Sequence, residues 1–188
     1  MTNSDTSDCT SIERPLREHF ARLAIAFRVF RHPPLHTVKE SQELRGNIPG
    51  SHIKNLLLRD KKRRIWLVTV REDHPVDLKG LRPVLGASGT LSFAGPDLLA
   101  ETLAVEQGAV TPLAVMNDSA GRVTAVLDEA LLAATWINCH PLHNEATVSL
   151  TPAELLGFMR DRGHDPTIHR FPDLQADMTG TPDTPSAA

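Results

Sequence analysis

The sequence has no tyrosine, and aromatic residues make up only 4% of its 188 positions. Proteins that bind single-stranded nucleic acid stack bases on aromatic side chains, so this composition argues against that class. Only two cysteines are present, Cys9 and Cys139, which is too few for a disulfide framework and favours a reducing, cytoplasmic location. No apolar run approaches the ~18 residues that cross a bilayer, and the first residues lack a basic-then-apolar signal pattern. We therefore expect no membrane partner.

The charge is also modest. The chain has 20 basic and 23 acidic residues, for a formal net charge of -3. This balance excludes a protein that coats nucleic acid, DNA included, by bulk charge. Recognition of nucleic acid would have to depend on a local basic patch.

The chain length fits one folded domain. Residues 1–11 form a polar leader, and residues 172–188 contain several prolines and little that could be buried. We expect both ends to be disordered and the domain to cover residues 12–171.

The predicted elements give an α+β fold, with a mixed central β-sheet flanked by helices and no regular βαβ alternation. Residues 27–31 fit either the end of the first helix or a strand, because prolines that would stop either element follow at positions 33 and 34. Helices are predicted from Pro15, over 37–45, 77–85 and 96–105, and from Thr151 to Gly163. Strands are predicted over 53–58, 65–70, 91–93, 113–116, 123–127, 135–138, 147–150 and 167–171.

Lys54 and Asn55 form the most informative pair. They stand between a glycine-proline turn at residues 46–50 and the apolar run at 56–58. A strand that otherwise reads as buried does not normally accept a lysine without a partner. We expect an anion there, such as a phosphate or the oxyanion of a substrate. The alternative is a strand-end lysine that reaches solvent.

Three other segments carry candidate chemistry. The segment from Gly108 to Pro112 repeats the glycine-proline pattern, although taken alone an ordinary helix-to-strand connection explains it better. Cys139, His140 and His143 suggest zinc, but Pro141 prevents the two histidines from sharing a helix face, so we expect no metal. The basic residues at the predicted hairpin tip fit either a solvated turn or contacts with nucleic-acid phosphates: Arg59, Lys61, Lys62, Arg63 and Arg64.

Taken together and in this order, these segments resemble the prolyl-tRNA editing family, also called YbaK-like deacylases, over most of residues 14–171. The sequence is most similar to the stand-alone alanyl-tRNA(Pro) deacylases. The resemblance rests on His36-Thr37-Val38, residues 50–62, Val76-Asp77-Leu78-Lys79, Leu91-Ser92-Phe93, residues 108–112, Asn117-Asp118 and residues 140–144.

The resemblance implies that Lys54 is the essential catalytic side chain and that no metal or other cofactor takes part. It places the aminoacyl pocket at Ile53, Asn55, Gly108, Ala109, Val110, Thr111, Pro112, His140 and Asn144. The expected partners are mischarged tRNA(Pro) and prolyl-tRNA synthetase. The charge pattern of the basic hairpin tip makes it the expected contact with the tRNA. Three residues, Ile53, Leu57 and Glu145, depart from the usual family pattern, which leaves cysteine and serine open as alternatives to alanine.

An aminoacyl ester is already activated, so hydrolysis needs mainly a positioned water and stabilisation of the oxyanion. Such a site would exclude proline by size, with Ile53, Val110 and Leu113 as the expected filter, and use the substrate's own 2′-hydroxyl to place the water. A non-catalytic RNA- or nucleotide-binding module is the competing hypothesis.

Overall fold

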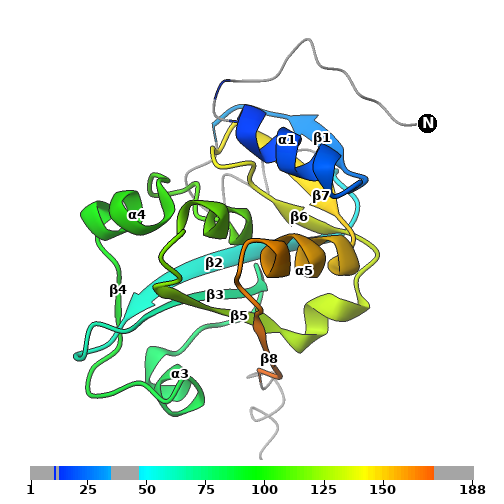
Figure 1. Ribbon diagram of the computed structural model, residues 1–188. Helices are drawn as coiled ribbons and strands as arrows, with labels where there is room; N and C mark the ends of the chain where they lie inside the picture. Colours follow the sequence, from blue (N-terminus) through cyan, green and yellow to red (C-terminus); the bar gives the residue numbers. More distant parts are fainter. Residues whose placement is uncertain (1–10, 12, 35–46, 172–188) are drawn as a thin grey trace, which may run out of the picture.

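The structure is a computed structural model that describes residues 11, 13–34 and 47–171, and it shows one mixed β-sheet with helices on both faces (Figure 1). This confirms the predicted single-domain α+β fold. The expected helix at 37–45, residues 1–10 of the leader and the C-terminal tail lie outside the described residues.

Most of the elements lie close to their predicted positions. The strands are β1 Arg28–Arg31, β2 Ser51–Arg59, β3 Ile65–Arg71, β4 Ser92–Phe93, β5 Val123–Asp128, β6 Ile137–Cys139, β7 Ala146–Leu150 and β8 Thr167–His169. The α-helices are α1 Glu13–Arg22, α3 Leu78–Val84, α4 Pro96–Leu103 and α5 Pro152–Asp161. Two 3₁₀ helices complete the described elements, η2 Pro112–Asn117 and η3 Glu129–Ala133.

Strand β2 lies in the middle of the sheet, whose order is β1-β7-β6-β2-β3-β5-β8, with β4 also paired to β2. It forms the predicted antiparallel hairpin with β3, from Ile53 opposite Arg71 to Arg59 opposite Ile65. On its other side β2 pairs in parallel with β6, through Ser51 and His52. The first part of β2 therefore borders one half of the sheet, and the rest borders the other.

The two faces of the sheet are covered by separate cores. Helices α1, α4 and α5 pack on one face, where Phe20, Leu103 and Phe158 are fully buried. Helix α3 covers the opposite face, where Leu58, Val68 and Leu81 form a smaller core. Side chains alternate between the faces of a strand, so consecutive residues of β2 contribute to different cores.

Two local predictions are resolved by the backbone. Helix α1 ends near Ala24, which has a left-handed φ of 52°, so residues 28–31 form strand β1. Helix α5 begins as predicted, because Thr151 and Glu154 form a reciprocal capping box.

The strand predicted at 113–116 is wrong. Thr111 caps the segment by accepting a hydrogen bond from the Leu113 amide, and Pro112 has the fixed φ of a first helical residue. The residues therefore form helix η2. Its apolar run is buried on several sides and lacks the period that separates a short helix from a strand.

Within residues 11, 13–34 and 47–171, none of the helices combines the length and the apolar character needed to cross a membrane.

Candidate functional site

The start of β2 is fixed by Gly50, which has a φ of 117°. A side chain here would lie 2.7 Å from the carbonyl oxygen of Trp136, so only glycine fits. The next amide, of Ser51, donates a hydrogen bond to that same oxygen at 2.8 Å. The turn thus holds the first residues of β2 against β6.

Lys54 lies four residues into this strand and is half-buried. It is on the same face as Leu56 and Leu58, which pack against the smaller core. Burial lowers the pKa of its ammonium group, while the charges of Asp73 and Glu72 act in the opposite direction. Across the described part of the chain, no side chain forms a hydrogen bond or ion pair with Lys54. The cation is therefore available to an external anion.

Asn55 points to the opposite face, together with Ile53, which packs against the larger core. Its Nδ2 donates to the carbonyl oxygen of Val110 at 2.9 Å, and its Oδ1 accepts from the Thr69 hydroxyl at 2.8 Å. The amide side chain thus connects β2, β3 and the loop at residues 108–112. The loop lies against the face of β2 opposite to the Lys54 side chain. Asn55, the neighbour of Lys54, links the strand to the loop.

The loop itself is largely internal. Gly108 has a φ of 91°, which favours glycine, and Ala109, Thr111 and Pro112 are buried. Val110 is half-buried, so its apolar side chain is more accessible than those of Ala109 and Pro112. Whether this loop lines an aminoacyl pocket remains a prediction.

The segment at residues 140–144 is held by two histidines. His140 Nδ1 lies 3.1 Å from the carbonyl oxygen of Ala146, and burial lowers the pKa of its ring, which favours the neutral form. His143 Nε2 lies 2.6 Å from Oε1 of Glu13, a buried carboxylate that also binds Arg31. Asn144 is half-buried. The two imidazoles therefore have different partners.

A row of polar side chains next to Lys54 was not predicted. His52 is on the same face of β2 as Lys54, and its Nε2 lies 3.2 Å from Nδ2 of Asn138 on β6. Ser149 on β7 donates to Oδ1 of Asn138 at 2.5 Å. Asn138 and Ser149 are almost fully buried, so the face that carries Lys54 has a built polar lining. Alternation of polar and apolar residues at 137–139 and 147–150 was the available signal.

No group of three or more His, Cys, Asp or Glu side chains is placed to hold a metal ion in the part of the chain that the structure describes. Cys139 is buried in the larger core, and burial raises the pKa of its thiol, which disfavours the thiolate needed for nucleophilic attack.

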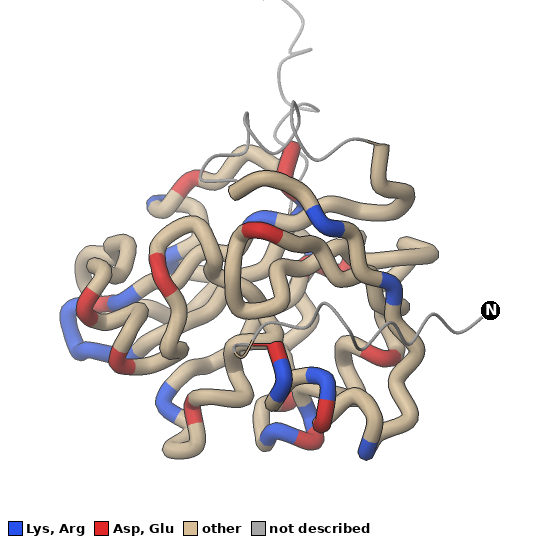
Figure 2. The backbone as a smooth tube through the Cα atoms, turned by 90° about the horizontal axis from the view of Figure 1, so that it is seen from above, with Lys and Arg blue, Asp and Glu red and all other residues tan. Residues whose placement is uncertain are grey.

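The basic residues of the hairpin lie at the far end of β2. Figure 2 shows Lys and Arg gathered at this edge of the molecule. Arg59, Lys61, Lys62 and Arg63 are exposed, and none of them forms an ion pair with the described residues. Arg64 differs, because its guanidinium binds the Asp60 carboxylate at 2.8 Å and the Gly86 carbonyl oxygen at 2.7 Å.

Comparison with known proteins places this arrangement in a family. Residues 32–158 match the model of the aminoacyl-tRNA editing domain. The chain is 44% identical over 162 residues to prolyl-tRNA synthetase associated domain-containing protein 1 of Danio rerio, covering 85% of this chain and 88% of that protein. It is 34% identical over 143 residues to prolyl-tRNA editing protein ProX of Acetoanaerobium sticklandii, covering 76% and 87% respectively.

The fold is likewise similar to a solved structure of a candidate trans-editing enzyme for prolyl tRNA synthetase. The TM-score is 0.66 at 22% identity, over 87% of this chain and 98% of the other. The match to the family model covers β2, the 108–112 loop and the 140–144 segment. The chain therefore belongs to the aminoacyl-tRNA editing domain family and, within it, to the prolyl-tRNA editing family.

Proposed function

We propose that this protein is a trans-editing deacylase that hydrolyses the ester of mischarged tRNA(Pro), with alanine as the amino acid. Membership of the prolyl-tRNA editing family supports the reaction class. The observation that carries the site assignment is Lys54, a half-buried ammonium without an internal partner among the described residues.

In the proposed reaction, water attacks the ester carbonyl carbon, and the bond between that carbon and the ribose oxygen breaks. The products are free alanine and tRNA(Pro). The ammonium of Lys54 stabilises the negative charge on the carbonyl oxygen as water attacks, and the low-dielectric surroundings strengthen this interaction. The 2′-hydroxyl of the substrate helps to place the water, so the reaction requires no protein nucleophile.

The remaining assignments are part of the same proposal. Asn55 holds β2 against the 108–112 loop and thereby fixes the position of Lys54. His140 and Asn144 are the proposed substrate contacts from the segment after β6. Exclusion of proline by size also belongs to this proposal. Leu113 cannot contribute to it, because its side chain is fully buried in the core.

The test is hydrolysis of alanyl-tRNA(Pro) by the purified protein and by Lys54→Ala. Loss of an oxyanion-stabilising group lowers kcat by about 10²–10³-fold, and we expect a fall of this size. Lys79→Ala removes an exposed lysine of α3 and serves as the matched control. Normal turnover by Lys54→Ala at saturating substrate would remove the assignment.

Amino-acid specificity needs a separate experiment. A binding site gains only about 1–3 kcal/mol per methylene, so a synthetase that handles proline cannot reject alanine cleanly, and a second sieve is required. Parallel assays with alanyl-, cysteinyl-, seryl- and prolyl-tRNA are expected to show fastest release of alanine. Rapid cleavage of prolyl-tRNA would contradict exclusion by size.

The competing hypothesis is a non-catalytic RNA-binding module, which the exposed basic hairpin alone would satisfy. It predicts binding of tRNA(Pro) without release of the amino acid. A prolyl-tRNA synthetase partner is a further proposal, supported by the names of the relatives.

A further inference from the structure

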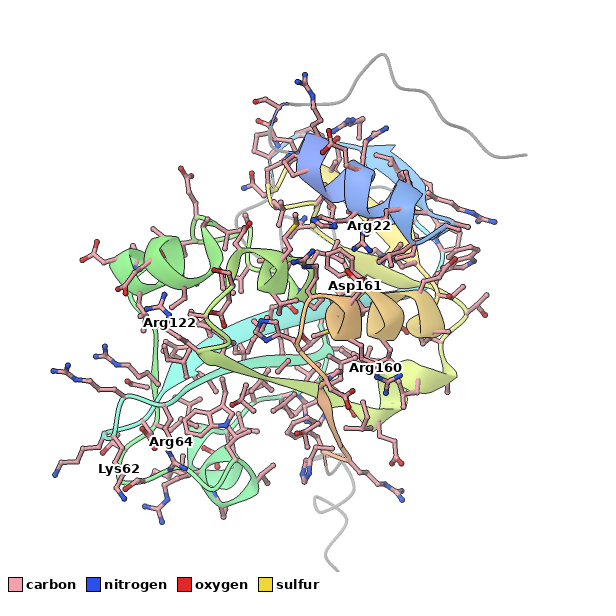
Figure 3. The ribbon with its side chains drawn as sticks, in the orientation of Figure 1. Arg22, Lys62, Arg64, Arg122, Arg160 and Asp161 are labelled. Carbon is pink, nitrogen blue, oxygen red and sulfur yellow. The ribbon has the colours of Figure 1, made fainter. Side chains whose placement is uncertain are left out.

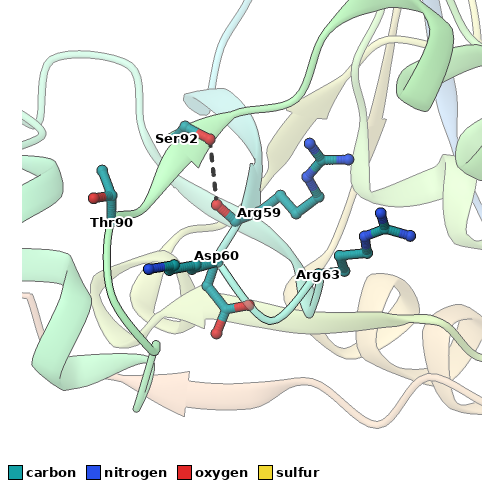
Figure 4. A pocket seen from close by; sticks show the side chains of 6 residues that line it. Arg59, Asp60, Arg63, Thr90 and Ser92 are labelled. Carbon is teal, nitrogen blue, oxygen red and sulfur yellow. Dashed lines mark hydrogen bonds between the residues drawn. The ribbon is translucent and has the colours of Figure 1, made fainter.

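We propose that the tip of the β2–β3 hairpin contains a pocket that binds a backbone phosphate of an RNA duplex. The proposal rests on the proposed function, since we take the duplex to be the acceptor stem of the tRNA substrate. The hairpin pocket, as we name it, has a volume of about 300 Å³ (Figure 4). It is lined by Arg59, Asp60, Lys61, Arg63, Thr90 and Ser92.

The lining combines the groups that bind phosphate. The guanidinium groups of Arg59 and Arg63 extend to the same side of the turn, whereas the Asp60 carboxylate points away from them (Figure 4). Thr90 and Ser92 add two exposed hydroxyl groups, and the Ser92 hydroxyl makes only a long 3.4 Å hydrogen bond to the Arg59 carbonyl oxygen. Arginine and hydroxyl side chains together are typical partners of phosphate oxygens in nucleic acids.

The turn is held in shape by a buried carboxylate. Asp60 accepts hydrogen bonds from the amides of Arg64, at 3.0 Å, and Ser88, at 2.9 Å, and it also binds the Arg64 side chain. Its negative charge is therefore neutralised inside the turn and does not oppose an anion in the pocket. Arg64 helps to hold the turn in shape, so the other exposed basic residues of the tip are the ones available to bind a phosphate.

Arg63 adds a second sign of a built site. It has a φ of 64°, a left-handed conformation that is unfavourable for a side-chain-bearing residue, and its amide donates to the Asp60 carbonyl oxygen at 3.0 Å. Turns at such positions usually use glycine or asparagine. Here the position is occupied by an arginine. The strained backbone is explained if this conformation is what directs the Arg63 guanidinium into the hairpin pocket.

The distance between Lys54 and the hairpin pocket indicates which part of the RNA the pocket binds. Arg59 lies five residues after Lys54 on the same strand, a separation of roughly 16 Å at the rise of a β-strand. A terminal aminoacylated ribose held at Lys54 cannot also fill the hairpin pocket. A ligand that reaches both must be an extended polyanion, as the stem of a tRNA is.

The experiment measures the affinity for an uncharged RNA minihelix that carries the acceptor stem of tRNA(Pro). We expect Arg59→Ala and Arg63→Ala each to weaken binding about 3–10-fold and to lower the slope of log affinity against log salt by about 1. Thr90→Val combined with Ser92→Ala should weaken it about 2–5-fold.

Arg160→Ala is the matched control, because Arg160 is an exposed arginine on α5, well away from Lys62 and Arg64 (Figure 3).

Two results would overturn the proposal. One is unchanged affinity and salt slope in the Arg59→Ala/Arg63→Ala double variant. The other is an equal loss of affinity in Arg160→Ala, which would indicate a general charge effect. The proposed function is judged separately. If the unaltered protein releases no alanine but the double variant loses minihelix binding, the proposed hydrolysis is refuted and the hairpin pocket is supported. If the double variant hydrolyses alanyl-tRNA(Pro) normally with an unchanged KM, the hydrolysis is supported and the hairpin pocket is refuted.

Discussion

The side-chain amide of Asn55 donates a hydrogen bond to the carbonyl oxygen of Val110 across 2.9 Å, and so ties strand β2 to the loop at residues 108–112. On its other side Asn55 accepts a hydrogen bond from Thr69, whose side chain is fully buried. Because Asn55 is next to Lys54, this bridge fixes the backbone that carries the proposed catalytic cation.

Asn55→Ala should destabilise the fold and reduce hydrolysis together. The substitution leaves the Thr69 hydroxyl and the Val110 carbonyl oxygen without partners, and each loss costs about 1–3 kcal/mol. We expect the free energy of unfolding to fall by about 2–4 kcal/mol in urea denaturation. Thr69→Val breaks only the bond to Asn55 Oδ1 and should cost about half as much. A loss in Asn55→Ala no larger than that in Thr69→Val would contradict the bridging role.

Gly50→Ala should be among the most destabilising glycine substitutions in the described chain. A Cβ at this position would lie 2.7 Å from both the Cβ and the carbonyl oxygen of Trp136, in addition to the strain of a φ of 117°. We expect a loss of about 3 kcal/mol or more in the free energy of unfolding. Gly121→Ala is the control, because Gly121 has a φ of 61° with open space around it, and only about 1 kcal/mol is expected there. Equal losses in the two variants would refute a steric role for Gly50.

Asp60 should contribute to stability in a pH-dependent manner. Burial alone would raise its pKa, but hydrogen bonds from the Ser88 amide and from Arg64 outweigh it and lower the pKa from 3.8 to about 2. Because the folded-state pKa is the lower one, the stabilisation is present above pH 3.8 and is lost as the pH falls toward 2.

The measurement is the melting temperature between about pH 5 and pH 2. Asp60→Asn should start with a lower melting temperature and lose less of it across this window than the unaltered protein. Glu106→Gln, which alters an exposed carboxylate, should follow the unaltered protein. Parallel curves for Asp60→Asn and the unaltered protein would show that this carboxylate is not the titrating group.

Local patterns predicted most elements because the sequence carries their physical causes. The β2–β3 hairpin follows from two β-rich runs around a charged turn, and the start of α5 follows from Thr151, Pro152 and Glu154. The pairing of β1 with β7, more than 100 residues later, leaves no comparable local trace. The segment at 113–116 was misassigned because burial hides the period of a short helix.

The candidate site shows the same division. Lys54 and Asn55 could be singled out because a cation and an amide interrupt an apolar strand, but a sequence does not show that the loop at 108–112 packs on the far face from Lys54. The row formed by His52, Asn138 and Ser149 depends on the lateral order of β2, β6 and β7, which only the folded chain reveals.

Strand β2 is the only strand that joins the two halves of the sheet by pairing within the described residues, with β6 at one end and with β3 along most of its length. Removing it would expose the apolar interiors on both faces at once. Neither half of the sheet is therefore expected to stay folded without the other. We expect the protein to unfold in one cooperative thermal transition with no half-folded intermediate.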